Sequence, residues 1–173
     1  MGWFDKGKLT NENLIKLFVM VLIYVLLGNL NSLVANPIVP GAVVAVNMII
    51  VVLAGILFGK EVGLLTGLMG TSINGVITGS NFEYASIIPH LIMGWAAGKI
   101  REKKGLIGSS LAIIIGHALN VIAYLIAGLM TQEDINNTFW KGLAYEALFG
   151  IISIIIIAWL YIKIFKHEKD KNK

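Results

Sequence analysis

Long apolar runs, separated by short gaps that hold most of the charged residues, are the feature that most constrains this chain. The first run, residues 14–35, is too long for the core of a signal peptide and ends at Asn36-Pro37 rather than at a small-residue cleavage site. Charged residues make up 14% of the 173 residues and hydrophobic residues 57%, which leaves too little charge to cover a soluble domain. We therefore predict an integral, multi-pass protein of the cell membrane.

The apolar runs predict an all-α fold, with residues 1–173 as a single transmembrane domain built as a bundle of six membrane-spanning helices. The expected spans cover about residues 13–35, 42–58, 62–78, 84–100, 106–130 and 141–165. Two of them are short, which leaves four spans as an alternative, but residues 62–100 would then form a long apolar loop.

The distribution of basic residues supports six spans, because every basic cluster then falls on one side of the membrane. These clusters are Lys6 with Lys8, Lys60, residues 101–104 and the tail at 163–173. The positive-inside rule accordingly places both termini in the cytoplasm. The net charge of +4 lies beside membrane segments, so we expect contact with anionic lipid headgroups rather than with nucleic acid.

The chain lacks several kinds of catalytic chemistry. It has no cysteine, no GxxxxGKS/T phosphate loop, and neither an HExxH nor a GxSxG motif. We therefore expect no ATPase activity, no hydrolase activity and no cofactor. Two histidines and one glutamate within the spans give only a weak case for a metal site, since they lie on three separate helices.

Polar side chains within the spans are the candidates for function, because they are costly in hydrocarbon and usually face a cavity or the bundle interior. His117, Asn120 and Tyr124 are spaced i, i+3, i+7 and share one face of the fifth span. His90, Asn120, Asn74 and Glu146 are all expected in the outer half of the membrane, which predicts one outward-opening pocket. The candidate substrate-binding residues are Asn36, Asn74, Tyr84, His90, His117, Asn120, Tyr124, Trp140, Tyr145 and Glu146.

Structural alternatives stand beside several of these candidates. His117 lies near mid-membrane and is equally consistent with packing, and asparagines such as Asn29 and Asn47 are consistent with hydrogen bonds between helices. Tyr84, Trp140 and Tyr145 could form an ordinary interfacial aromatic belt. The glycines at four-residue intervals, Gly55, Gly59, Gly63 and Gly67, indicate close packing inside the bundle rather than a subunit interface.

Residues 47–105 resemble the S components of energy-coupling factor (ECF) transporters. The resemblance rests on an apolar run, the turn Phe58-Gly59-Lys60-Glu61-Val62-Gly63, a glycine-rich helix, and a following span that ends in a small basic loop. It implies a membrane subunit that captures a vitamin or similar micronutrient outside the cell. It also implies a coupling transmembrane subunit and two ATPase subunits as partners. Where the family often has Ala-x-x-x-Ala on its first helix, this chain has Gly28-x-x-x-Ser32.

The leading hypothesis is therefore a substrate-binding subunit of an importer. In it Asn74, Asn120 and His90 hydrogen-bond the ligand, the aromatic residues stack on it, and residues 34–41 act as a lid. Glu146 would pair with an amino or cationic group, which favours an amine-bearing heterocycle. Two alternatives remain open: a structural scaffold of the cell envelope, and an intramembrane enzyme using Glu146 with His90 or His117.

Overall fold

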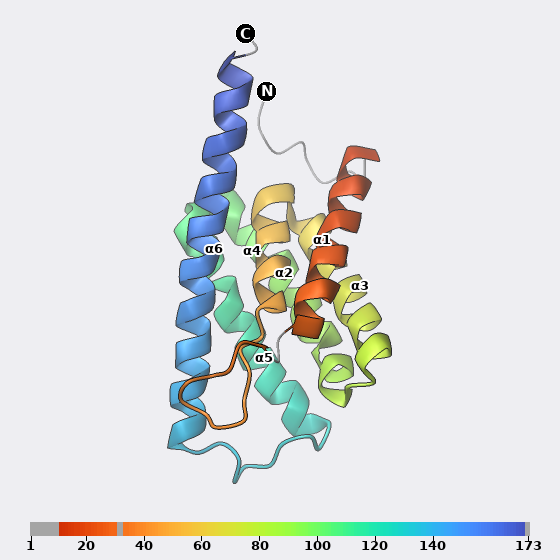
Figure 1. Ribbon diagram of the computed structural model, residues 1–173, viewed down its shortest axis with the longest axis vertical. Helices are drawn as coiled ribbons and strands as arrows, with labels where there is room; N and C mark the ends of the chain where they lie inside the picture. Colours follow the sequence, from red (N-terminus) through yellow and green to blue (C-terminus); the bar gives the residue numbers. More distant parts are fainter. Residues whose placement is uncertain (1–10, 31–32, 172–173) are drawn as a thin grey trace.

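The computed structural model describes residues 11–30 and 33–171, with side chains as far as Ile164. Within these residues the chain forms six helices (Figure 1). They are α1 (Asn11–Leu30), α2 (Asn47–Phe58), α3 (Lys60–Thr78), α4 (Asn81–Ser110), α5 (Ala112–Ile126) and α6 (Asn137–Lys171). The predicted all-α fold is thereby confirmed, and the helices follow the order of the predicted spans. Lys6, Lys8, Ser32 and the side chains of the C-terminal tail lie outside the described residues.

Helix length and composition agree with a membrane protein. Within the part of the chain that the structure describes, α1 and residues Asn137–Ile164 of α6 are each long and apolar enough to cross a bilayer. The pair α4 and α5, bent by 78° at its break, qualifies as a third span, and α2 is a shorter apolar helix. At a rise of about 1.5 Å per residue, α2 alone is too short for a core about 30 Å thick.

The connection that leads into α2, residues 33–46, takes up positions that the sequence assigned to the first two spans. α1 ends at Leu30 and α2 begins at Asn47. The strand-like bridge between Ala35 and Val43 replaces helix here. Its backbone bonds run from Val44 N to Val34 O at 2.8 Å and from Asn36 N to Ala42 O at 2.9 Å. Two prolines between the paired segments cannot donate helical hydrogen bonds, which disfavours helix within this connection.

The other helix ends also differ from the expected spans, each for a local reason. α4 starts at Asn81 and continues to Ser110 across a break at Gly105, whose φ is 70°. α5 ends at Ile126, before the expected limit at residue 130, because the amide of Leu129 bonds to Tyr124 O at 2.9 Å. α6 starts early because the side chain of Asn136 accepts a hydrogen bond from Phe139 N at 3.1 Å, which caps the helix.

α2 lies at the centre of the bundle and is buried over residues 47–56. It contacts α1, α3, α4 and α6, so the core surrounds it. α3 and α4 pack most extensively on each other. A β-carbon on Gly67 of α3 would overlap the backbone carbonyl of His90 in α4, so this close approach requires glycine. The predicted role of the glycine row in internal packing is confirmed at this position.

Figure 1 shows how the ends of the helices are grouped. The start of α1, the α2–α3 junction and the last part of α6 lie toward one end of the molecule. The 33–46 connection and the link between α5 and α6 lie at the opposite end. This grouping matches the two sides that the charge pattern predicted. The assignment of the first end to the cytoplasm stays a prediction.

Candidate functional site

A buried polar network joins α1, α3 and α4 around the hydroxyl group of Tyr24. The side chain of Tyr24 is 0% exposed. Its hydroxyl lies 3.0 Å from Thr71 Oγ1, 3.0 Å from His90 Nδ1 and 3.3 Å from Glu83 Oε2. Thr71 Oγ1 and His90 Nδ1 are themselves 2.9 Å apart. Three polar groups from two other helices thus meet at one tyrosine.

The backbone of α3 and α4 explains why these groups meet. The contact of Gly67 with the backbone at His90 brings the two helices together. Thr71 lies one turn after Gly67 and so faces the imidazole of His90. Gly70, the neighbour of Thr71 on α3, leaves room for the ring of Tyr24. The geometry of the network therefore depends on small residues in α3.

Glu83 forms the end of the network nearest the α3–α4 turn. Its Oε1 atom accepts a hydrogen bond from Asn74 Nδ2 at 2.7 Å, and Asn47 of α2 is a further side-chain partner. The other end of the Asn74 amide is also engaged, because Asn29 Nδ2 donates to Asn74 Oδ1 at 3.0 Å. Both ends of Asn74 are therefore bonded within the protein, and Glu83 connects four helices.

His90 links this network to α5. Asn120 Nδ2 lies 3.2 Å from His90 Nε2 and 3.8 Å from Met48 Sδ. Asn120 Oδ1 and His117 Nε2 are buried and have no hydrogen-bond partner among the described residues. His117 and Asn120 are each 5% exposed and lie one turn apart on α5. Buried polar atoms are almost always paired, so these two atoms are candidates for contact with a ligand.

Asn36 and Glu146 form a second group, which fastens the 33–46 connection to α6. Asn36 Nδ2 donates to Gly142 O at 3.3 Å, while its Oδ1 accepts from Ile38 N at 2.9 Å. Glu146 Oε1 accepts from Ala45 N at 2.5 Å. One carboxyl oxygen of Glu146 thus binds a backbone amide, and its pairing with a cationic ligand stays a prediction.

The four predicted aromatic residues differ in their contacts and exposure. Tyr124 OH is 2.7 Å from Ser86 Oγ, and its ring meets Phe82 edge-on. Tyr145 stacks on Phe149 of the same helix. Tyr84 packs over Gly75 with 45% of its surface exposed, and Trp140 is 53% exposed. Tyr84 follows Glu83 in the first turn of α4, and Tyr124 reaches α4 from α5 through Ser86.

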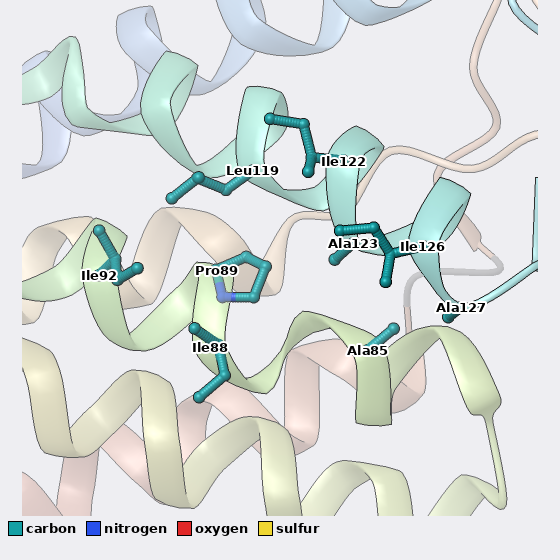
Figure 2. A pocket seen from close by; sticks show the side chains of 9 residues that line it. All are labelled: Ala85, Ile88, Pro89, Ile92, Leu119, Ile122, Ala123, Ile126 and Ala127. Atoms are coloured by element: carbon teal, nitrogen blue, oxygen red, sulfur yellow. The ribbon is translucent and has the colours of Figure 1, made fainter.

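Pro89 and His90 face different surroundings. Pro89 lines an apolar groove of about 330 Å³ between α4 and α5, and its ring points toward α5 (Figure 2). The groove is lined by Ala85, Ile88, Pro89, Ile92, Leu119, Ile122, Ala123, Ile126 and Ala127. His90 is buried in the polar network on the inner side of α4. The apolar groove is therefore separate from the polar site.

Outside the membrane-spanning segments, Asp134 orders the connection between α5 and α6. Its carboxylate accepts hydrogen bonds from Thr131 N at 2.7 Å and from Thr131 Oγ1 at 2.9 Å. These bonds hold the pKa of Asp134 below its ordinary value. Among the described residues, no group of three His, Asp or Glu side chains is arranged to hold a metal ion.

The sequence analysis brought His90 and Asn120 together but did not include Tyr24, Thr71 or Glu83 among the candidates. The expected spans 62–78 and 84–100 leave Glu83 in the gap between them, whereas it lies in the first turn of α4. A tyrosine in the middle of an otherwise apolar helix was the available signal for Tyr24. Thr71 shares a helical face with Asn74, and that spacing was the signal for Thr71.

Comparison with known proteins identifies a family. The family model described as "ECF-type riboflavin transporter, S component" matches residues 8–167. This match confirms the resemblance seen at residues 47–105 and extends it to nearly the whole chain. No curated protein and no solved structure matches.

Proposed function

The chain belongs to the family of ECF-type riboflavin transporter S components, and from this premise we propose that its substrate is riboflavin. As a member, it is an integral membrane protein and a substrate-binding subunit of a transporter, not an enzyme. The intramembrane enzyme and the structural scaffold are thereby set aside. The match over residues 8–167 is the observation that carries the proposal.

We place the ligand against α5, where His117 Nε2 and Asn120 Oδ1 are buried without a partner among the described residues. The flavin ring carries carbonyl oxygens and an imide N–H at one edge. An imidazole N–H can donate to such a carbonyl, and an amide oxygen can accept from the imide. A planar ring of this kind combines a large apolar surface with a few polar atoms, as vitamin pockets require.

The other predicted residues take supporting roles in this proposal. Tyr124, with Phe82 against its ring, offers an aromatic surface near His90. Asn36 and Glu146 hold the connection that covers the end of the bundle. Riboflavin has no amine, so the expected pairing of Glu146 with a cationic ligand is not part of the proposal. Tyr84, Trp140 and Tyr145 would contribute aromatic contacts at the entrance to the binding site.

Binding is tested by quenching of riboflavin fluorescence on titration with the purified protein. We expect saturable binding, and we expect Asn120→Ala with His117→Gln to weaken it by about 100-fold, because two hydrogen bonds inside a desolvated site are lost. Asn11→Ala with His167→Gln changes the same residue types elsewhere in the chain and serves as the control. Absence of riboflavin binding to the folded, unsubstituted protein would refute the substrate.

We further propose that uptake depends on a coupling transmembrane subunit and two ATP-hydrolysing subunits. The chain itself carries no phosphate-binding loop, so the energy for uptake has to come from elsewhere. Vesicles that contain this protein with such a module should accumulate riboflavin only when ATP is present. Equal accumulation by this protein alone would contradict the requirement.

A further inference from the structure

The direction of each hydrogen bond in the polar network follows from Glu83. The side chains of Asn74 and Asn47 donate to Glu83 and favour its ionised form, with Asn74 Nδ2 lying 2.7 Å from Oε1. An ionised carboxylate can only accept hydrogen bonds. The hydroxyl of Tyr24, 3.3 Å from Oε2, accordingly uses its hydrogen to donate to Glu83. The oxygen of Tyr24 is then left as an acceptor toward the other members of the network.

Thr71 and His90 are the two groups that could donate a hydrogen bond to the oxygen of Tyr24. Thr71 Oγ1 donates to Tyr24 OH at 3.0 Å. His90 Nδ1 then faces two oxygens, at 2.9 and 3.0 Å, whose hydrogens are already used. If Nδ1 carried no hydrogen, its lone pair would face a lone pair on the oxygen of Tyr24, and the two would repel each other. Nδ1 therefore carries the hydrogen and donates it to Thr71.

The tautomer of His90 in turn fixes the amide of Asn120. With the hydrogen on Nδ1 of a neutral ring, Nε2 is an acceptor. Asn120 Nδ2 donates to it at 3.2 Å, and the second hydrogen of the amide is available to Met48 Sδ at 3.8 Å. The amide nitrogen is fully used, and Oδ1 remains buried without a partner among the described residues.

We propose that Tyr24, anchored by Glu83, is a positioning residue that acts through Thr71 and His90 to hold Asn120 with its carbonyl oxygen toward the substrate. The subsite then selects a ligand that donates a hydrogen bond, such as the imide N–H of a flavin. This inference rests on the proposed function for the identity of the ligand. The hydrogen-bond chain itself can be tested without any ligand.

The ligand-free test is nuclear magnetic resonance of protein with ¹⁵N-labelled histidine. His117→Gln and His167→Gln assign the signals, and we expect His90 to carry its hydrogen on Nδ1. In Tyr24→Phe, Thr71 loses its acceptor and donates to Nδ1 instead, so the hydrogen should move to Nε2. Tyr161→Phe, which changes a tyrosine outside the network, should leave the signal unchanged. A hydrogen on Nε2 in the unsubstituted protein would overturn the proposal.

The ligand test compares riboflavin with a derivative methylated at the imide nitrogen. The unsubstituted protein should bind the methylated compound at least about tenfold more weakly, because a site built to accept a hydrogen bond rejects a ligand that lacks the donor. In Tyr24→Phe the side-chain amide of Asn120 can rotate so that its nitrogen and oxygen exchange places. The ratio of the two affinities should then fall to about threefold or less. Tyr161→Phe should keep the original ratio.

The two tests separate the possible failures. Equal affinity for both compounds in the unsubstituted protein, or an unchanged ratio in Tyr24→Phe, would overturn the positioning role. Failure of riboflavin to bind at all would instead refute the proposed function, while the histidine signals still decide the hydrogen-bond chain. If Tyr24→Phe does not fold, the tautomer and the binding ratio of the unsubstituted protein remain decisive.

Discussion

Glu146 of α6 accepts a hydrogen bond from the backbone amide of Ala45 at 2.5 Å, although the two residues lie 101 positions apart in the chain. Together with the bond from Asn36 to Gly142 O, this contact fastens the connection after α1 to the last helix. The connection lies at the end of the bundle where the α5–α6 link also lies (Figure 1). Its attachment should therefore control how readily a bound ligand leaves.

Glu146→Ala removes the acceptor and should speed ligand release. Its loss leaves the backbone amide of Ala45 unpaired, which costs about 1–3 kcal/mol, so we expect the dissociation rate to rise about tenfold or more. Glu146→Gln keeps an acceptor oxygen and should have a smaller effect. Recovery of riboflavin fluorescence after dilution measures the rate. Equal rates for Glu146→Ala and the unsubstituted protein would show that the contact does not restrain the connection.

Gly67→Ala should destabilise the protein, because the added methyl group would overlap the backbone at His90. Overpacking of this kind costs about 1–3 kcal/mol, and it would also separate Thr71 from His90. Thermal unfolding in detergent measures the loss. Val76→Ala, at an exposed position of the same helix, is the control and should change the midpoint little. A midpoint for Gly67→Ala that matches this control would contradict the close packing of α3 on α4.

Asn136→Ala should weaken the start of α6. The side chain of Asn136 accepts from Phe139 N at 3.1 Å, and loss of such a cap costs about 1 kcal/mol. For a chain of this size that corresponds to a fall of about 2–4 °C in the unfolding midpoint. Asn137→Ala, at the adjacent exposed position, is a matched control. If both variants unfold at the same temperature, Asn136 does not cap α6.

Much of the fold could be predicted because hydrophobic runs and basic clusters report the membrane directly. The residues at which the helices begin and end were harder to predict. Residues 34–44 pair with each other through their backbone groups, partly where the apolar runs predicted helix, and such pairing leaves no periodic signal in an apolar run. Asn136 shows the opposite case, because an asparagine three residues before Phe139 is a capping pattern visible in the sequence.

The candidate site was predictable only in part. Helical spacing and depth placed His90 beside Asn120, and the structure joins them at 3.2 Å. The position of Tyr24 in an apolar helix indicated a buried polar group, but its partners lie 47 to 66 positions away and could not be predicted from spacing. Glu83 was missed because a carboxylate next to a turn is usually solvated. Here three other helices supply donors or partners to it.

The consecutive residues Pro89 and His90 face two different regions on either side of α4. Pro89 lines the apolar groove shown in Figure 2, and His90 bonds to Asn120 on the inner side of the same helix. A single turn of α4 thus separates a surface suited to hydrocarbon from the buried polar network. An acyl chain or a neighbouring protein in the groove would therefore contact the same turn of α4 that carries the imidazole of His90.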